Sequence, residues 1–390
     1  MSSGPLVIIG NISDHPFALD IGYYCNQRVD VSDVISLKDF QNTEFCPRFI
    51  SDEVDLSAGG DYLKGKIVVI VSTSMTTETR NSLAMRNLIL ARAAKDNGAE
   101  KVILMEPDLF YSCQDRGPRV SHSFFEEERA PKDRKKFDGQ PFTSFLYAQL
   151  LKLAGVDRTV TVHNHSESTQ ALFSDMFDGG FKDLVPNAVF ANYLETSGIV
   201  DFNNLVLCAP DRGAAPFVDL IKETMSCNPQ ILKMDKERSG ERSIAMVPSE
   251  VSEIRMEDVE GKDVIVFDDM VRTGTTIVKC CRLIKEYKPR RIIFCVTHFH
   301  SSAESREKLS DDSIDEIVTT NTIPSILNRD TQGRLRKKLI VLKLEKWVAQ
   351  NLMDSCGVPH SELEDSDLFS IDMSSKNPRW HPDIGRSFHK

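Results

Sequence analysis

The feature that most constrains this 390-residue chain is a run of four apolar residues that ends in two acids and a threonine-rich turn. It reads VIVFDDMVRTGTT over 264–276, and a helical pattern begins at Ile277. The order strand, loop, helix places the loop at the carboxyl end of a parallel strand, where open α/β sheets bind ligands. Gly274 permits a tight turn, and the amides and hydroxyls that follow it can surround a phosphate at the helix start.

The two acids, Asp268 and Asp269, adjoin this expected phosphate site. Carboxylates suit a ligand that carries hydroxyl groups or a bound Mg²⁺, so the segment predicts a ligand with both a phosphate and hydroxyls. An ordinary acidic turn after a strand is the alternative interpretation. The combination of paired acids, Thr-Gly-Thr-Thr and the flanking strand and helix favours the phosphate loop. It indicates a class of ligand and leaves the reaction open.

Bulk properties exclude several classes of protein. The formal net charge of −10 argues against a nucleic-acid binder, which would present a basic face. The longest apolar runs are strand-sized and the first residues show no secretory pattern, so we expect no membrane span and no signal peptide. Nine cysteines without a Cys-x-x-Cys pair predict reduced thiols in a cytoplasmic protein. Adjacent Cys280 and Cys281 could form a redox pair, but two core residues of a helix are the preferred interpretation.

The order of elements predicts the fold class. Strand-like runs are expected at 6–9, 67–71, 102–105, 159–162, 205–207, 264–267, 292–296 and 339–342. Helical patterns at 83–97, 143–154, 215–226 and 276–287 lie between many of them. This alternation predicts an α/β protein with parallel sheets and helices on both faces. Segments 66–98 and 263–287 share one plan of strand, polar loop and helix, which indicates an internally duplicated pair of domains.

Two other strand ends carry candidate ligands. Asp211 lies in a Pro-Asp-x-Gly turn after the strand at 205–207, where it could hold Mg²⁺ or a sugar hydroxyl, or simply make the turn. His163 and His165 follow the strand at 159–162 at alternate positions. Alternate residues of a strand point to the same face, so one metal or phosphate could meet both imidazoles. Exposed or hydrogen-bonded histidines are the alternative.

A polar segment at 234–242 is rich in cations and is expected to be a flexible loop. Its Lys236 and Arg238 could close over a polyphosphate and neutralise charge during transfer. A solvated run of charges is the alternative. The dense charges of 121–138 indicate a solvated insertion in the same way.

Taken in order, these segments resemble the ribose-phosphate diphosphokinases, also called phosphoribosyl diphosphate (PRPP) synthetases. The likeness runs from about residue 5 to 352, and its further matches are Ser72-Thr73-Ser74, Gln114-Asp115-Arg116, 155–158 and 320–324. Transferases that consume PRPP share only the loop at 268–276. The remaining matches therefore favour a synthetase over a PRPP-consuming transferase.

The resemblance implies the domain organisation. It implies two similar phosphoribosyltransferase-like domains, each a mainly parallel sheet flanked by helices. Residues 1–178 would form an N-terminal domain on the ATP side, with the charged insertion at 121–138. Residues 179–335 would form a C-terminal domain on the ribose 5-phosphate side. Residues 336–390 would return to the N-terminal domain and add an extra tail.

The resemblance also implies the reaction and its residues. The family transfers the β,γ-diphosphate of ATP to the C1 hydroxyl of ribose 5-phosphate, releasing AMP, for nucleotide biosynthesis. Catalytic roles would fall to Lys236 and Arg238. Ribose 5-phosphate would be bound by Asp268, Asp269, Thr273, Gly274, Thr275 and Thr276. The nucleotide site would comprise Phe49, Glu53, Gln114, Asp115 and Arg116, the first two from a neighbouring subunit. Mg²⁺, the expected cofactor, would lie by His165, Asp211 and His163.

The resemblance implies ATP and ribose 5-phosphate as partners, with no nucleic acid or membrane. It also implies a homo-oligomer built from dimers, of which a hexamer is one form. Three substitutions mark a divergent member: His163 replaces the family's acid, Cys113 an arginine and Arg272 an acid. A non-catalytic regulatory subunit is therefore the alternative. The active enzyme is favoured because the chain keeps Lys236, Arg238, His165, Asp211 and both loop acids.

Overall fold

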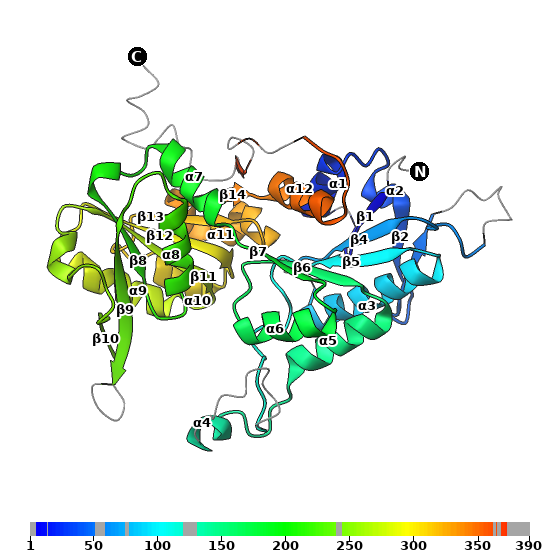
Figure 1. The fold of residues 1–390 in the computed structure, drawn as a ribbon, viewed down its shortest axis with the longest axis horizontal. Helices are drawn as coiled ribbons and strands as arrows, with labels where there is room; N and C mark the ends of the chain where they lie inside the picture. The colour runs from blue at the N-terminus through cyan, green and yellow to red at the C-terminus, as the bar shows by residue number, and fades with distance from the viewer. Residues whose placement is uncertain are drawn as a thin grey trace, which may run out of the picture. The chain divides into compact units, whose positions relative to one another are not determined.

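The computed structural model describes residues 5–13, 15–50, 59–74, 78–119, 131–238, 244–361, 364 and 368–372 (Figure 1). The chain divides into two compact units, each with its own core. Unit 1 comprises Met1–Val185 and Glu345–Glu362, and unit 2 comprises Pro186–Leu344 and Leu363–Lys390. The first division lies at 185/186, against the expected 178/179, and the chain re-enters unit 1 at Glu345, against the expected 336.

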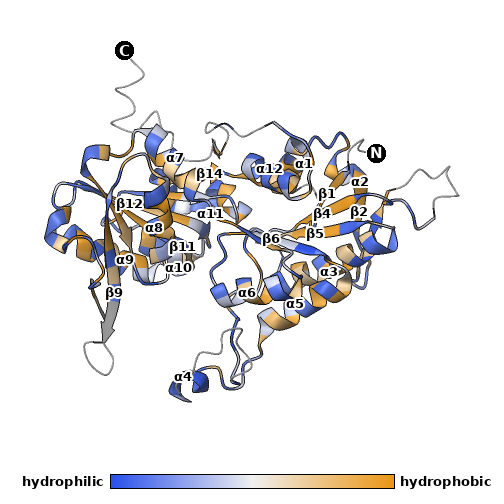
Figure 2. Cartoon of the chain, viewed as in Figure 1, coloured by the Kyte–Doolittle hydropathy of each residue, from blue (hydrophilic) through white to orange (hydrophobic). Residues whose placement is uncertain are grey.

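Unit 1 is built on a parallel sheet of five strands. Its order is β1 (Leu6–Gly10), β4 (Ile67–Val71), β5 (Lys101–Met105), β6 (Arg158–Val162) and β7 (Phe181–Leu184). Nearly every residue of β4 and β5 is buried on both faces, because the crossovers between parallel strands place helices over the sheet. Figure 2 shows these strands as hydrophobic.

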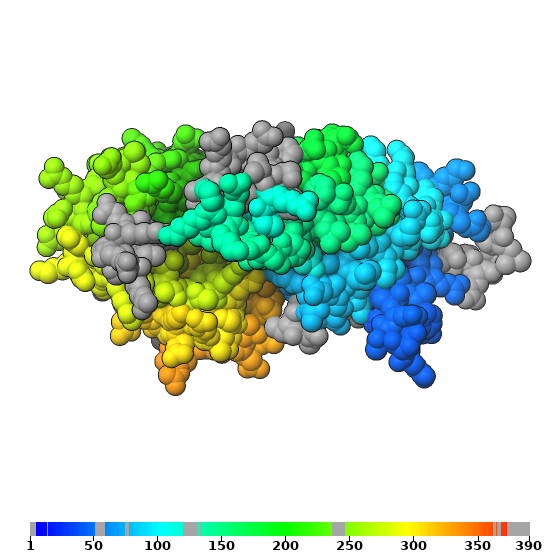
Figure 3. Space-filling view, turned by 90° about the horizontal axis from the view of Figure 1, so that it is seen from below, coloured from blue at the N-terminus to red at the C-terminus, as the bar shows by residue number. Residues whose placement is uncertain are grey.

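Two groups of helices belong to unit 1. The helices α3 (Arg80–Asp96), α5 (Thr143–Ala154) and α6 (Glu167–Met176) connect successive strands and pack side by side. Helix α1 (Pro16–Tyr24) packs against α12 (Glu345–Ser355), which is the returning part of the chain. The smaller elements are α2 (Val31–Val34), α4 (Pro131–Lys135) and a hairpin of β2 (Ile35–Asp39) and β3 (Phe45–Phe49). In Figure 3, α4 and α5 (teal to green) lie at the surface.

Unit 2 is built on a sheet of eight strands. Its order is β10 (Ile244–Pro248), β9 (Gln230–Arg238), β8 (Leu205–Ala209), β11 (Asp263–Val271), β12 (Arg291–Phe299), β13 (Glu316–Thr320), β14 (Leu339–Lys343) and β15 (Ser370–Ile371). The six strands from β9 to β14 are parallel, whereas the edge strands β10 and β15 are antiparallel. Strand β11 is central, so its first five residues are fully buried.

Helices cover both faces of this second sheet. On one face lie α7 (Asn187–Ser197) and α8 (Ala215–Thr224), whose Phe190 and Phe217 meet Phe267 of β11 edge to face. On the other lie α9 (Thr275–Lys285) and α10 (Ala303–Leu309). The short helices are α11 (Arg329–Gln332), η1 (Phe202–Asn204), η2 (Met256–Val259), η3 (Pro324–Leu327) and η4 (Gly333–Lys337).

The expected α/β fold class is confirmed, and every expected strand and helix is present. The expectation of a loop across 234–242 is wrong in its first half, because β9 continues to Arg238, which pairs with Ile244 of β10. A strand near a sheet edge tolerates charged residues on its solvent side, so the sequence of β9 lacks the apolar pattern by which strands are predicted. All nine cysteines are free, and Cys280 and Cys281 are buried in α9 as expected. Among the described residues, no helix combines the length and apolarity of a membrane span.

A buried carboxyl group ties together the loops of unit 1. Glu106 follows β5 and is inaccessible to solvent. Its Oε1 accepts hydrogen bonds from Ser72 Oγ and Asn87 Nδ2, each at 2.9 Å, and from Tyr147 OH at 3.2 Å. Its Oε2 accepts the amide N–H of Phe110 at 2.9 Å. Burial raises the pKa of Glu106 to about 7, because desolvation disfavours the charged form more than these donors favour it.

Glu106 should make the stability of the protein depend on pH. With its folded-state pKa raised from 4.5 to about 7, its contribution is fully present below pH 4.5 and is lost as pH rises through 7. We expect the parent to lose roughly 3 kcal/mol relative to Glu106→Gln between pH 4 and pH 8, measured by urea denaturation. The exposed Glu100→Gln variant is the control. Parallel pH profiles for the parent and Glu106→Gln would contradict the prediction.

A second buried acid anchors the start of β11. Asp263 is inaccessible to solvent and accepts the amide N–H of Asp201 at 2.7 Å. Arg290 forms a two-point ion pair with it, with Nε 2.8 Å from Oδ1 and a second contact to Oδ2. These bonds fix the entry of the central strand beside its neighbour β8.

Replacing Asp263 by Asn should lower the free energy of unfolding by about 2 kcal/mol, since the guanidinium of Arg290 loses its buried counter-charge. Chemical denaturation measures the loss. The exposed Glu260→Gln variant removes a charge from the neighbouring turn and should change stability by less than about 0.5 kcal/mol. Equal stability of the two variants would show that Asp263 anchors nothing.

Candidate active site

The loop between β11 and α9 has the geometry of a phosphate cradle. Gly274 adopts a left-handed conformation with φ of 75° and is the N-cap of α9. A Cβ at this position would lie 3.0 Å from Cγ of Leu309, so both the backbone and the available space require glycine. Glycine offers no side chain to cap the helix, which leaves the first amides of α9 available to an anion.

Threonine hydroxyls line the same turn. Thr273 and Thr275 are exposed, and their Oγ1 atoms lie 3.4 Å apart. Thr276 is partly buried in the first turn of α9. Helix amides, the positive end of the helix dipole and these hydroxyls together can surround a phosphate. The structure thus brings together the four loop residues that the sequence singled out.

A cluster of carboxylates adjoins the cradle. Asp268 and Asp269 lie within β11, which runs beyond its expected end at Phe267 to Val271. Burial raises the pKa of Asp268 well above its ordinary value, and the charges of Asp269 and Asp211 raise it further. Asp211 therefore lies close enough to act on Asp268, although it belongs to the turn after β8. The repulsion within this cluster favours binding of a cation or of hydroxyl donors.

Asp211 also makes the plain turn that was its alternative reading. Its Oδ1 accepts the amide N–H of Gly213 at 3.1 Å, which fixes the carboxylate at the carboxyl end of β8. Asp269 is fixed in a similar way, because its Oδ1 accepts the N–H of Met270 at 2.7 Å. A carboxylate accepts several hydrogen bonds, so each of these acids can accept further bonds from a ligand.

The donor chemistry of this cluster fits Mg²⁺, which prefers carboxylate oxygens. Among the described residues, no three His, Cys, Asp or Glu side chains are arranged to hold a metal ion by themselves. Mg²⁺ commonly takes only one or two protein carboxylates and completes its octahedron with water and substrate phosphates. The arrangement therefore suits a metal that arrives with a phosphorylated substrate.

The candidate catalytic residues lie on β9. Lys236 pairs with Met246, and Arg238 with Ile244, in the antiparallel ladder between β9 and β10. The side chains of Lys236 and Arg238, and residues 239–243, lie outside the described part of the chain. The preceding Asp235 binds Arg212 through two hydrogen bonds of 2.7 and 3.1 Å. This ion pair joins β9 to the turn that carries Asp211.

In unit 1, the two candidate histidines do not share a face. His163 follows the end of β6 with φ of 46°, and this left-handed residue breaks the alternation of the strand. Its side chain is buried, whereas that of His165 is exposed. The strand alternation that would let one ligand meet both imidazoles is therefore absent here, and the metal-binding role of the two histidines stays a prediction. Beside them, Asp183 accepts the N–H of Asn164 at 3.1 Å, and burial raises the pKa of Asp183 to about 6.

The candidate nucleotide residues of unit 1 separate into two groups. Gln114 and Arg116 are exposed on either side of Asp115, which accepts a 2.5 Å hydrogen bond from the hydroxyl of Ser166. Phe49 lies at the end of β3 and is only 5% exposed, so its ring offers little surface to a nucleotide. Glu53 lies outside the described residues.

One contact at the cradle was missed by sequence reasoning. The ammonium of Lys308, on α10, donates a 2.7 Å hydrogen bond to Oγ1 of Thr275. The two residues are 33 positions apart, and no local pattern links them. Only the packing of α10 beside α9 creates this contact.

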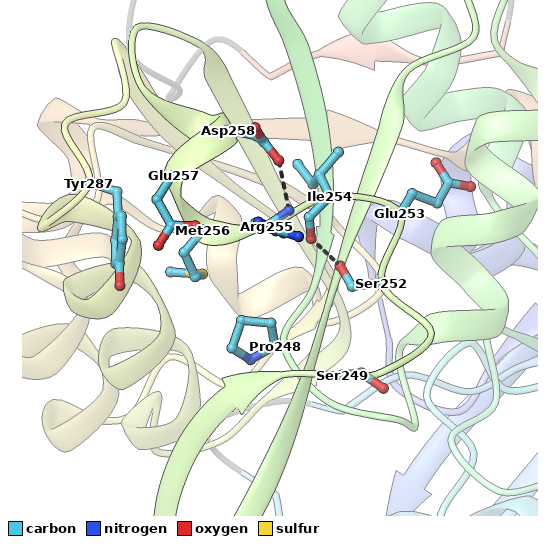
Figure 4. Close-up of a pocket in the computed structure, with 10 residues that line it drawn as sticks. All are labelled: Pro248, Ser249, Ser252, Glu253, Ile254, Arg255, Met256, Glu257, Asp258 and Tyr287. Carbon is cyan, nitrogen blue, oxygen red and sulfur yellow. Dashed lines mark hydrogen bonds between the residues drawn. The ribbon is translucent and has the colours of Figure 1, made fainter.

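A separate cavity of about 550 Å³ lies elsewhere in unit 2 (Figure 4). It is lined by the last residue of β10, Pro248, by Ser249 and residues 252–258 of the segment that follows, and by Tyr287. Tyr287 follows the carboxyl end of α9, whereas the cradle lies at its amino end, about 16 Å away along the helix. Polar groups here bond within the segment, as Ser252 Oγ does to the carbonyl of Ile254 at 2.9 Å. This cavity is distinct from the candidate active site.

Known proteins match the chain in sequence and in fold. Residues 187–328 match the family model described as a phosphoribosyl transferase domain. "Ribose-phosphate pyrophosphokinase 4" of Saccharomyces cerevisiae is 29% identical over 68% of this chain and 72% of the relative. "Ribose-phosphate pyrophosphokinase" of Corynebacterium efficiens is 27% identical over 80% of this chain and 88% of the relative.

The fold has a solved counterpart in the phosphoribosylpyrophosphate synthetase from Mycobacterium smegmatis. That structure has a TM-score of 0.69 and 22% identity, with 91% of this chain and 99% of the other covered. The match extends over both units, beyond the part matched by the phosphoribosyl transferase domain alone. Together with the sequence likeness to its relatives, it leads to one conclusion: the chain is similar in sequence to the ribose-phosphate diphosphokinases (PRPP synthetases) and has the fold of a solved PRPP synthetase.

Proposed function

We propose that this protein is an active ribose-phosphate diphosphokinase. It transfers the β,γ-diphosphate of ATP to the C1 hydroxyl of ribose 5-phosphate and releases PRPP and AMP. One observation carries the proposal: a helix-start phosphate cradle and three carboxylates adjoin each other at the carboxyl ends of β8 and β11. A sugar phosphate presents the matching groups, a phosphate at one end and hydroxyls at the other.

Within this site, the chain's residues bind and orient the sugar. The amides after Gly274 and the hydroxyls of Thr273, Thr275 and Thr276 hold the 5-phosphate. Asp268 and Asp269 accept hydrogen bonds from the ribose hydroxyls, which fixes the position of C1. Asp211, anchored by its turn, lies on the C1 side. Such positioning accounts for much of the catalysis in phosphoryl transfer, because the reacting oxygen must meet the phosphorus in line.

Charge neutralisation completes the proposed mechanism. Mg²⁺, when bound with the nucleotide, would neutralise phosphate charge near Asp211. Lys236 and Arg238 supply positive charge to the diphosphate and to the departing AMP. Gln114, Asp115 and Arg116 contribute to the nucleotide site. We propose a dimer-based homo-oligomer in the cytoplasm, as the family resemblance implies.

The rival proposal is a regulatory subunit without catalysis. His163 and Cys113 stand at positions where the family has an acid and an arginine. Phosphorus NMR of the purified protein with ATP, ribose 5-phosphate and Mg²⁺ separates the two. We expect PRPP and AMP to appear together. Binding of ribose 5-phosphate without turnover would replace this proposal by the regulatory one.

The same assay tests the role of Lys236. Replacing Lys236 by Ala should lower turnover on the order of a thousandfold while ribose 5-phosphate affinity is unchanged, since the ammonium acts on the transferring phosphate. Lys262→Ala removes the same charge at the amino end of β11 and should retain parent turnover. Turnover of Lys236→Ala within a few-fold of the parent would remove Lys236 from the mechanism.

Asp269 should contribute to binding of the sugar. The Asp269→Asn variant is expected to bind ribose 5-phosphate about tenfold more weakly, because a charged carboxylate that accepts hydrogen bonds is replaced by a neutral amide. Isothermal titration calorimetry measures the dissociation constant. Asp312→Asn, an exposed change outside the cluster, is the matched control. An unchanged affinity in Asp269→Asn would refute the assignment.

A further inference from the structure

We infer that Lys308 is a further ligand of the substrate's 5-phosphate and sets a preference for a dianionic phosphate group. The inference rests on the proposed function, since it concerns the same sugar-phosphate site. It adds a residue from outside the loop at 268–276, contributed by a different helix. The evidence is the position, the hydrogen bonds and the charge of this side chain.

The position of Lys308 follows from the packing of α10 beside α9. Leu309 lies under the cradle, with its Cγ 3.0 Å from the place where a Gly274 Cβ would be. Leu309 is inaccessible to solvent, so it fixes the carboxyl end of α10 against the turn. Lys308 precedes it and extends to the rim of the cradle, where Nζ lies 2.7 Å from Oγ1 of Thr275.

The hydrogen bonds of Lys308 leave capacity for a ligand. An ammonium group has three N–H donors. One is donated to Thr275 Oγ1 and one to the carboxylate of Glu304, one helical turn earlier, at 2.6 Å. Neither takes the third donor, and the side chain of Lys308 is 36% exposed. A phosphate bound by the amides after Gly274 would contact the hydroxyl that this ammonium already binds.

The acidic residues around the cradle favour a cation beside the phosphate site. Asp211 and Asp269 place carboxylates next to a site for an anion, and burial and these neighbours raise the pKa of Asp268 beside them. A phosphate dianion needs local positive charge to bind beside them, beyond the partial charge of a helix start. Arg272 and Lys308 are the cations next to Thr273 and Thr275 in sequence and in contact, respectively. Lys308 donates its hydrogen bond directly to a hydroxyl of the cradle.

Glu304 acts as the resting partner of Lys308. It is 56% exposed, so its pairing with Lys308 is a surface ion pair of small net stability. A phosphate oxygen offers the ammonium a stronger, charge-assisted bond. Substrate binding therefore shifts the hydrogen bonds of Lys308 from the carboxylate toward the phosphate. A sugar without the phosphate group gains nothing from this exchange.

Calorimetric titration of the full-length protein with ribose 5-phosphate, and with inorganic phosphate as a second probe, tests the inference. Lys308→Met keeps the length of the side chain and removes its charge. We expect this variant to bind both ligands about tenfold more weakly and to raise KM for ribose 5-phosphate by the same factor. Its kcat at saturation should stay within about twofold of the parent value. Glu304→Gln frees the ammonium and should bind ribose 5-phosphate at least as tightly as the parent. Lys262→Met, at the far end of β11, should match the parent.

The outcomes separate this inference from the function on which it rests. If the parent binds ribose 5-phosphate and Lys308→Met binds it equally well, Lys308 is no ligand, and the proposed function stands. If Lys308→Met weakens binding but Lys308→Arg does not restore it, the charge has no part and the inference fails. If the parent itself does not bind ribose 5-phosphate, both the proposed function and the role of Lys308 are refuted. Matching circular dichroism melting curves confirm that the variants are folded.

Discussion

The burial of β11 at the centre of an eight-stranded sheet is the constraint on which the rest of unit 2 depends. Its first five residues contact helices on both faces and strands on both sides, so none of them can carry an exposed polar group. The acids of this strand can therefore lie only near its ends. Asp263 at the start is neutralised by Arg290, and Asp268 and Asp269 occur where the strand leaves the core.

That arrangement explains why the acids at the two ends of one strand differ in their surroundings. At the start of β11, a buried acid with a guanidinium partner anchors the strand. At its end, Asp268 and Asp269 lie near the turn that carries Asp211, and burial, reinforced by the charges of Asp269 and Asp211, raises the pKa of Asp268. The protein tolerates this unfavourable charge where a sugar, a cation or both would relieve it. Gly274 then turns the chain sharply enough to present helix amides beside the acids.

Unit 1 repeats the plan with different chemistry. The corresponding ends of β4 and β5 carry Ser72 and Glu106, but these side chains bond inward to each other, to Asn87 and to Tyr147. Their polar groups form hydrogen bonds that hold the loops of unit 1 together. The exposed groups of this unit, Gln114, Arg116 and His165, occur farther along the loops. Both units thus have parallel strands flanked by helices and differ in which side chains at the strand ends face the solvent.

Much of this could be predicted from the sequence. Apolar runs bounded by turns identified the parallel strands, and the glycine with its threonines identified the cradle, because these features depend on neighbouring residues alone. Other features could not be predicted. The left-handed backbone of His163, the burial of Phe49 and the extension of β9 through charged residues arise from contacts with distant segments. The bond from Lys308 to Thr275 is of the same kind, since it exists only because α10 packs beside α9. The sequence by itself determined the strand, the turn and the helix start that form the cradle. The tertiary structure decided which side chains from other segments meet there, because residues far apart in the chain come together only through packing.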